Sequence, residues 1–210
     1  MAPPATEIGL DQHLDEQVPL HLEFRDEAGA PVTLERYFHD RPVVLALVYY
    51  ECPMLCTLVL NGLTRALNTL SFTAGREFQV VVVSIDPRDT PARARDKHRQ
   101  YVSAYGRAGA ESGWHFLTGA EPAIAKLAAS VGFRYRYDAS SGQFAHASGI
   151  MVLTPQAGFR ATSMASSTMR AICGWDWSRP HAARSDRSWS RCCCSASTTI
   201  RPPASTVSPS

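Results

Sequence analysis

The chain of 210 residues lacks a strong charge excess of either sign, since 21 Lys and Arg face 19 Asp and Glu. Its formal net charge of +2 gives no support to a nucleic-acid or membrane-surface partner. No apolar run reaches the roughly 18 to 20 residues that span a bilayer. The N-terminus lacks the basic and apolar regions of an export signal. We therefore expect a soluble chain in which neither a signal peptide nor a transmembrane segment is visible.

The C-terminal part of the chain, 163–210, contains no Leu, Phe, Tyr, Lys or Glu. It holds twelve Ser, six Arg and four of the six Cys. A segment of this composition cannot bury enough apolar surface to offset the entropy lost on ordering. We therefore divide the chain into an N-terminal extension (1–17), a folded domain (18–160) and a Ser/Arg/Cys-rich tail (161–210) that we expect to be disordered.

The folded part alternates short apolar runs with helical patterns, which predicts an α/β fold. The expected strands are 43–49, 78–85, 114–117, 133–137 and 149–153. The expected helices are 55–70, 91–105 and 122–131. Thr90 is the predicted N-cap of the second helix and Gly106 its end. A turn at 139–142 is expected to join the last two strands.

Cys52 and Cys56 lie where a predicted buried strand leads into a predicted helix. Four residues apart on a helix, their Cβ atoms are about 5 to 6 Å apart on one face, so the pair can bind one metal ion or form a disulfide. Backbone amides at a helix N-terminus also lower the pKa of a thiol. The alternative is a pair of small core residues. The position after a strand favours a reactive or metal-binding pair.

Two thiolates need further ligands to make a metal site. A structural zinc site takes four ligands, and no other Cys or His lies nearby in the sequence. Soft thiolates favour Cu(I), for which three ligands suffice. Of the seven His, His146 is the best placed, because small residues surround it between a predicted turn and a predicted strand. From the pattern alone, a solvated surface histidine remains the alternative.

Four segments together carry a resemblance to a known family. In chain order they are VVLALVYYECPMLCTLVLNGL, VVVSIDPRDTP, WHFLTG and FAHASGIMVLTP. Their order and spacing resemble the Sco/SenC family of copper chaperones over about residues 14–156. The resemblance implies a thioredoxin-like fold.

The resemblance also implies a site and a function. It implies copper ligation by Cys52, Cys56 and His146, with Asp86 influencing the metal or redox behaviour. The implied cofactor is copper, as Cu(I) and secondarily as Cu(II). The implied function is delivery of copper to cytochrome c oxidase during its assembly, with the copper-site subunit or another copper assembly factor as partner. The implied location is the periplasm or a membrane facing it, although the family's membrane tether is not visible in this chain.

After about Thr154 the family continues with a strand and a closing helix, where this chain has its tail. We therefore expect both elements to be missing or disordered. The segment 172–180 corresponds to an Asp-Leu-Arg-Leu-Gly-Leu-Val-Glu-Ala helix whose codons are read one base out of register. We interpret the tail as the product of a frameshift near residues 157–163.

Two other functions compete with the metallochaperone. A thiol-disulfide oxidoreductase would use Cys52 and Cys56 to exchange disulfides with a partner's cysteines. CxxxC departs from the CxxC of dedicated redox enzymes, so we favour the chaperone and leave enzymatic activity open. A peroxidase of the peroxiredoxin type is disfavoured because its Thr three positions before the reactive Cys is Tyr49 here. An inactive product that keeps the ligands but lacks the closing elements is the third interpretation.

Overall fold

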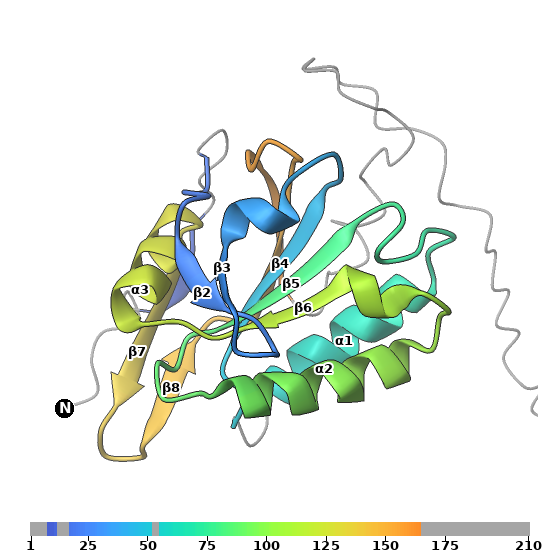
Figure 1. Ribbon diagram of the computed structural model, residues 1–210. Helices are drawn as coiled ribbons and strands as arrows, with labels where there is room; N and C mark the ends of the chain where they lie inside the picture. The colour runs from blue at the N-terminus through green and yellow to red at the C-terminus, as the bar shows by residue number, and fades with distance from the viewer. Residues whose placement is uncertain (1–7, 12–16, 52–54, 165–210) are drawn as a thin grey trace, which may run out of the picture. The chain divides into compact units, whose positions relative to one another are not determined.

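A computed structural model of the chain describes residues 8–11, 17–51 and 55–164 (Figure 1). All of these residues belong to one unit of the chain, Met1–Pro180. The second unit, His181–Ser210, lies outside the described residues. The expected disorder of the tail from residue 165 onward falls outside them as well.

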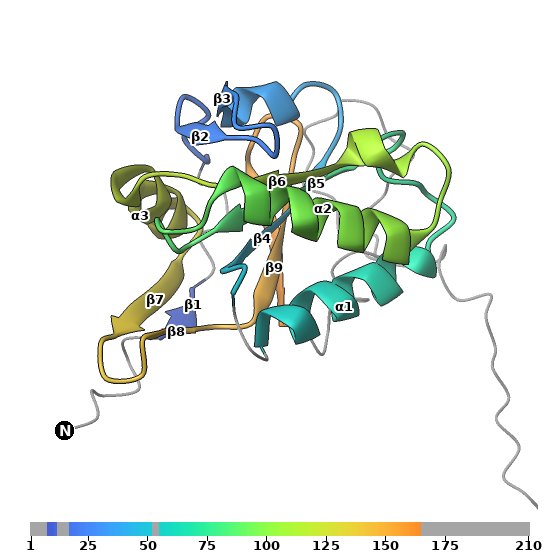
Figure 2. The same ribbon diagram turned by 60° about the horizontal axis from the view of Figure 1, so that its bottom comes forward.

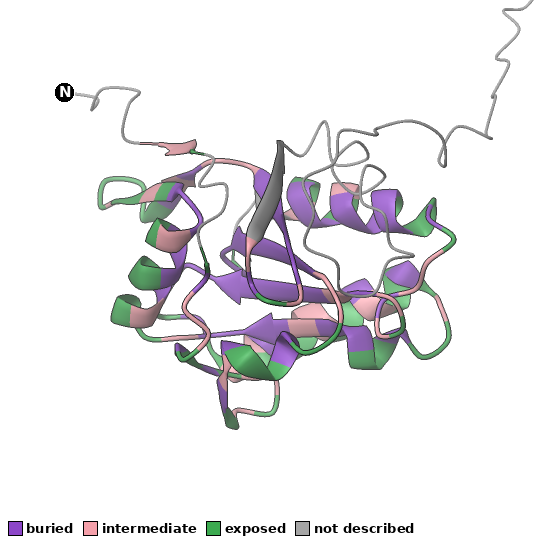
Figure 3. Cartoon of the chain, turned by 90° about the horizontal axis from the view of Figure 1, so that it is seen from above, coloured by how far each residue is buried: buried purple, intermediate pink, exposed green. Residues whose placement is uncertain are grey.

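The centre of the described part is a five-stranded sheet with the strand order β10-β9-β4-β5-β6. Its three parallel strands are β4 (Val43–Val48), β5 (Gln79–Ser84) and β6 (Trp114–Leu117). The predicted strands in these three places are confirmed to within one residue at each end. Every residue of β4 is buried, and the middle of the sheet is buried throughout (Figure 3). A strand covered on both faces has a continuous apolar sequence rather than an alternating one.

Three α-helices accompany the sheet in the described part, at the places predicted. They are α1 (Leu55–Asn68), α2 (Pro91–Tyr105) and α3 (Glu121–Ser130). α1 and α2 lie side by side on one face of the sheet (Figures 1 and 2), and α3 packs against β7. The predicted ends of α2 are confirmed, because Thr90 Oγ1 accepts a hydrogen bond from the Arg93 amide and Gly106 adopts a φ of 67°.

Stacked aromatic rings fix α2 on the sheet. The ring of Tyr101 on α2 is nearly parallel to those of Trp114 and Phe116 on β6, at centroid distances of 6.5 and 6.0 Å. All three side chains are fully buried. Aromatic pairs of this kind add about 0.5 to 1.5 kcal/mol beyond the area they bury. The C-terminal half of α2 is therefore held against β6.

The strands near the predicted turn 139–142 pair differently from the prediction. β7 (Phe133–Asp138) pairs with β8 (Gln143–His146), whereas β9 (Gly149–Leu153) joins the main sheet antiparallel to β4. The expected pairing of 133–137 with 149–153 is therefore wrong. The turn itself is present, and the Asp138 carboxylate accepts hydrogen bonds from two serines in it. β9 is buried throughout, which suits a strand with a neighbour on each side. The strand Gln-Phe-Ala-His is short and lies among small residues, so its sequence did not predict it.

A strand that was not expected closes the other edge of the sheet. β10 (Phe159–Met164) pairs antiparallel with β9, from Phe159 opposite Leu153 to Met164 opposite Gly149. The expectation that the closing strand is missing is therefore wrong, and β10 runs across the domain boundary proposed at residue 160. The segment adjoins the Ser-rich tail and was grouped with it, whereas its pairing with β9 depends on the backbone. The expected loss of the closing helix lies outside the described residues.

Smaller elements complete the described part. β1 (Gly9–Leu10) pairs with β7 to make a three-stranded sheet β1-β7-β8, and β2 (Glu23–Arg25) pairs with β3 (Pro31–Thr33). Short 3-10 helices occupy Leu34–Tyr37 and Ala110–Gly113. Elements of two to four residues carry too little periodicity to be predicted. Within the described ranges, no helix combines the length and the hydropathy needed to cross a bilayer.

Candidate metal site

The candidate site lies at the edge of the sheet where the parallel strands β4 and β5 end. The chain leaves β4 through Tyr49, Tyr50 and Glu51 toward the cysteine segment, and leaves β5 through the turn 85–90. Carboxyl ends of parallel strands meet at one edge, where α/β proteins place their binding sites. The two connections that carry the predicted site residues are therefore neighbours.

The two cysteines are the part of the predicted site that the structure describes least. Cys52 lies outside the described residues, and Cys56 lies in the first turn of α1 with its side chain outside the described part. The predicted shared face of the two sulfurs therefore stays a prediction. The expected helix start is confirmed, because α1 begins at Leu55.

His146 is the last residue of β8 rather than a loop residue, and it is only 7% exposed. Its burial excludes the solvated-surface alternative. The imidazole packs edge to face on Tyr49, with centroids 5.8 Å apart, and lies 5.9 Å from the ring of Phe133. Tyr49 comes directly after β4 and three positions before Cys52. The fold thus brings His146 to the connection that carries the cysteines.

The protonation state of His146 is defined by its surroundings. Nδ1 lies 2.7 Å from the Ala147 carbonyl oxygen, which can only accept, so Nδ1 carries the proton and the lone pair is on Nε2. Burial lowers the pKa of His146, although the hydrogen bond to Ala147 opposes this effect. A neutral imidazole with one nitrogen held by a carbonyl is the form in which histidine binds metals.

Asp86 lies just after β5, as predicted, and is buried. Its carboxylate accepts three hydrogen bonds from the Arg88 guanidinium, at 2.8 to 3.1 Å, and one from the Arg88 amide at 2.9 Å. Burial alone would raise the pKa of Asp86, but the hydrogen bonds from Arg88 lower it below its usual value. Asp86 is therefore an anion whose charge is matched by one arginine.

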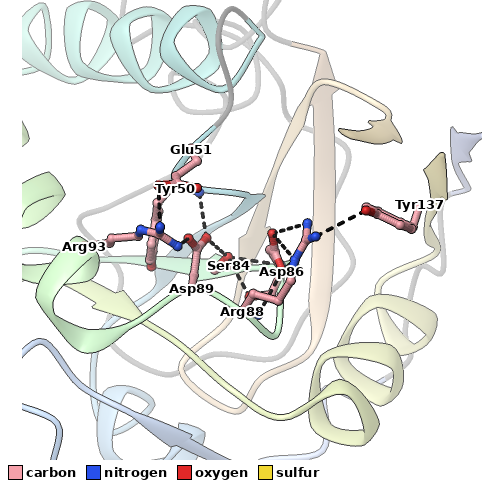
Figure 4. A network of polar contacts seen from close by, with 8 residues as sticks. All are labelled: Tyr50, Glu51, Ser84, Asp86, Arg88, Asp89, Arg93 and Tyr137. Atoms are coloured by element: carbon pink, nitrogen blue, oxygen red, sulfur yellow. Dashed lines mark hydrogen bonds and ion pairs between the residues drawn. The ribbon is translucent and has the colours of Figure 1, made fainter. Parts of the chain in front are cut away.

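A second carboxylate in the same turn holds the chain just before Cys52 (Figure 4). Asp89 Oδ2 accepts the Tyr50 amide at 2.8 Å and the Ser84 hydroxyl at 2.5 Å. Arg93 lies 3.5 Å from Asp89 Oδ1 and also pairs with Glu51 at 2.5 Å. Burial raises the pKa of Asp89, and the hydrogen bonds from Ser84 and Tyr50 oppose this effect. The segment that leads to the cysteines is thus tied to the turn after β5.

Comparison with known proteins places the chain in a family. A family model described as SCO1/SenC matches residues 11–173. The chain belongs to the SCO1/SenC family. The match extends past residue 156, where the resemblance was expected to end, and past the interval 157–163 in which we place the frameshift. A comparison with curated protein sequences gives no match.

Solved structures of SCO1/SenC proteins share the fold. Apo Sco1 from Thermus thermophilus is 23% identical, with a TM-score of 0.56 over 78% of this chain and 94% of that one. Arabidopsis thaliana ScoI with copper bound is 19% identical, with a TM-score of 0.58 over 72% and 92%. A SCO1/SenC family lipoprotein from Bacillus anthracis is 15% identical, with a TM-score of 0.59 over 79% and 98%. The predicted thioredoxin-like α/β fold is confirmed.

A groove of about 740 Å³ adjoins the site in this SCO1/SenC protein. Small residues of α3 form one wall, and aromatic residues of β7 and β8 form the other. Asp86 and Arg88 lie at one end of the groove, with Phe144 beside them. Among residues 8–11, 17–51 and 55–164, no three His, Cys, Asp or Glu side chains gather closely enough to hold a metal ion.

Three residues of this SCO1/SenC site were missed by the sequence analysis, namely Tyr49, Arg88 and Asp89. Tyr49 was counted as the end of an apolar run. Arg88 and Asp89 fell in the segment that ends the predicted strand 78–85, and no role was assigned to them. Arg88 and Asp89 could have been found from the sequence, because an arginine between two aspartates directly after a buried strand lies at the binding edge of an α/β sheet.

Proposed function

We propose that this protein is a copper-binding metallochaperone that holds one copper ion through Cys52, Cys56 and His146. Two thiolates and one imidazole form a soft donor set, which suits Cu(I) better than magnesium or calcium. A structural zinc site would need a fourth ligand. Membership of a family that includes a solved ScoI with copper bound supports the same metal.

The observation that carries the proposal is the placement of His146. A buried, neutral imidazole packs against Tyr49, the residue at which the chain leaves the sheet for the cysteine segment. Nδ1 is held by the Ala147 carbonyl, so Nε2 is the nitrogen that would bind a metal. An ordinary core histidine would not require a place beside the residue that leads into the cysteine segment.

Asp86 is proposed to modulate the site rather than to ligate. Its two carboxylate oxygens are engaged by Arg88, and a paired carboxylate is a poor competitor for a soft metal ion. Without its charge the Arg88 guanidinium would be left unmatched, and a positive charge disfavours the metal-bound or oxidised form of a nearby site through space. Replacing Asp86 by Asn should shift the potential of the cysteine pair while leaving the stoichiometry of copper at one.

The proposed destination of the copper is the copper site of cytochrome c oxidase, reached directly or through another copper assembly factor. We propose a location in the periplasm or on a membrane that faces it. The Bacillus anthracis relative is a lipoprotein, which supports a position at a membrane surface.

Anaerobic titration with Cu(I) against a chromophoric chelator tests the site. The parent should be the full chain in which Cys173, Cys192, Cys193 and Cys194 are replaced by Ser, so that tail thiols do not bind. We expect one tightly bound copper, loss of tight binding in Cys52→Ala/Cys56→Ala, and a loss of at least about tenfold, or about 1.4 kcal/mol, in His146→Ala.

His39→Ala is the matched control for the histidine variant, because His39 is exposed and precedes β4, at the opposite end of that strand from Tyr49. It should bind copper as the parent does. Equal affinity of the parent and the double cysteine variant would refute the site. Equal affinity of the parent and His146→Ala would remove the histidine from it.

A thiol-disulfide oxidoreductase is the second candidate function. It is favoured by the position of Cys56 in the first turn of α1, where helix amides stabilise a thiolate. Catalytic turnover of a disulfide substrate by copper-free protein, lost in Cys56→Ser, would support this function. Stoichiometric exchange without turnover would favour the chaperone.

A further inference from the structure

We infer that Arg88 is a positioning residue that holds the β7–β8 hairpin, and with it His146, against the turn after β5. The inference rests on the proposed function to the extent that His146 is taken as a copper ligand. The residues involved are shown in part in Figure 4, where Arg88 lies between Asp86 and Tyr137.

The guanidinium of Arg88 is fixed at one end by the turn after β5. Nε and Nη2 donate to both oxygens of the Asp86 carboxylate, at 2.8, 3.1 and 2.8 Å. The Arg88 amide donates to the same carboxylate at 2.9 Å. Bidentate hydrogen bonding of this kind fixes the plane of the guanidinium as well as its position.

The other end of the guanidinium contacts the hairpin. Nη1 donates to the hydroxyl of Tyr137 at 3.2 Å. The guanidinium carbon also lies over the Tyr137 ring at 4.9 Å and over the Phe144 ring at 5.8 Å. Tyr137 on β7 and Phe144 on β8 are direct register partners. One arginine therefore touches both strands of the hairpin at the same level.

Phe144 connects this contact to the histidine. Phe144 and His146 are two residues apart on β8, so their side chains lie on the same face of the strand. Both rings pack against Tyr49, at centroid distances of 5.6 and 5.8 Å. A movement of Phe144 would therefore move His146 relative to Tyr49 and to the segment that carries the cysteines.

The hairpin needs such contacts because it is not part of the main sheet. β7 and β8 belong to the three-stranded sheet with β1, whereas β4 and β5 lie in the five-stranded sheet. Backbone pairing of β8 is with β7, and only Ala147 and Ser148 join it to β9, so side-chain packing adds to that connection in setting the angle between hairpin and main sheet. The Arg88 side chain is 56% exposed, so its removal takes little area out of the core, and its cost to stability comes chiefly from the Asp86 carboxylate that loses its partner.

The test is a double-mutant cycle in the full chain that carries the four tail Cys→Ser substitutions. The variants are Arg88→Ala, His146→Ala and the two combined, with Arg88→Lys as the conservative replacement. Arg95→Ala, which removes an exposed arginine from α2, is the matched control. Cu(I) affinity is measured by chelator competition. The ring-proton shifts of His146 are measured by NMR in metal-free protein, because the Tyr49 and Phe133 rings shift them.

We expect Arg88→Ala to weaken Cu(I) binding roughly 10- to 100-fold, as the loss of residues behind metal ligands does. Its His146 ring protons should move toward the shifts of an unfolded histidine. In the His146→Ala background the same substitution should change affinity by less than about twofold. Arg88→Lys should lose nearly as much Cu(I) affinity as Arg88→Ala, because an ammonium group cannot donate paired hydrogen bonds to both carboxylate oxygens. Arg95→Ala should match the parent in both measurements.

Unchanged His146 shifts in Arg88→Ala would overturn the inference, and so would an equal loss of affinity in both backgrounds. If Arg88→Ala loses its cooperative melting, Tyr137→Phe replaces it and should move the His146 shifts in the same direction by less. Unmoved shifts in that variant would also overturn the inference. If the parent binds no copper through its cysteines and His146, the proposed function fails, and the metal-free NMR measurement still decides the role of Arg88.

Discussion

The ring of Tyr49 meets the ring of His146 edge to face, with an interplanar angle of 81°. Tyr49 is 6% exposed, and it also contacts Phe144. One side chain thus connects the end of β4, which leads to Cys52, with the strand that carries His146.

Replacing Tyr49 by Ala should lower the free energy of unfolding by about 3 kcal/mol, because truncating a buried aromatic leaves a cavity. It should also weaken Cu(I) binding, since the imidazole loses its packing surface. Urea denaturation and chelator competition measure the two effects. Tyr137→Ala is the control for stability and should cost about 1 kcal/mol, because Tyr137 is 43% exposed. Equal losses of unfolding free energy in Tyr49→Ala and Tyr137→Ala would contradict this account.

Oxidation and copper binding should exclude each other. Cys52 and Cys56 are expected to form an intramolecular disulfide, whose sulfurs are no longer thiolate donors. Mass spectrometry after mild oxidation should find the two residues linked, and the oxidised protein should not bind Cu(I) until it is reduced. Retention of tight Cu(I) binding by fully oxidised protein would contradict the ligand assignment.

Acid should destabilise the protein through His115, which lies on β6 and donates from Nε2 to Gln79 at 3.1 Å. Burial lowers the pKa of His115 to about 4, helped by the charges of His98 and Arg36. Folding therefore favours the neutral ring. The corresponding stabilisation is complete above the unfolded pKa of about 6.5 and is lost as the pH falls toward 4.

Replacing His115 by Gln should remove up to about 3 kcal/mol of this pH dependence between pH 6.5 and 4. Denaturant unfolding at several pH values measures it, with His21→Gln, at an exposed histidine, as the matched control. Some pH dependence of the free energy of unfolding should persist in His115→Gln, because burial also lowers the pKa of His146. An unchanged pH profile in His115→Gln would show that His115 is not the group responsible.

Two truncations should distinguish the contribution of β10 to stability from that of the tail. Ending the chain after Gly158 removes β10 and leaves one edge of β9 open, so we expect a loss of a few kcal/mol, at about 1 kcal/mol for each lost hydrogen bond. Ending it after residue 173, where the family match stops, should leave the melting temperature unchanged. Destabilisation by the second truncation would assign the remaining tail a structural role.

Local sequence determined the elements that could be predicted. Val43–Val48 and Gln79–Ser84 are continuous apolar runs, and Thr90 and Gly106 are terminal signals that need no tertiary information. Cys52 and Cys56 were selected because they follow such a run. Their assignment as ligands remains a prediction.

Other features depended on partners distant in sequence. β10 is a strand because β9 offers it an edge, and the alternation of apolar and polar residues at 159–162 is too short to predict it. β8 contains four residues, too few for periodicity to distinguish strand from loop. The role proposed for Arg88 requires Tyr137 and Phe144 to be brought to it by a hairpin that was paired incorrectly from sequence. Packing between elements, rather than local propensity, decides these positions.

The antiparallel pairing of β4 with β9 has a consequence for the order of assembly during synthesis. β4 and β5 are adjacent in sequence apart from α1 and can pair early, whereas β9 begins at Gly149. Contacts between distant segments form after local ones, since they require a larger loop to close. A chain leaving the ribosome therefore presents its CxxxC segment long before it has made His146. During that interval the thiols can react with oxidants or metal ions without the histidine.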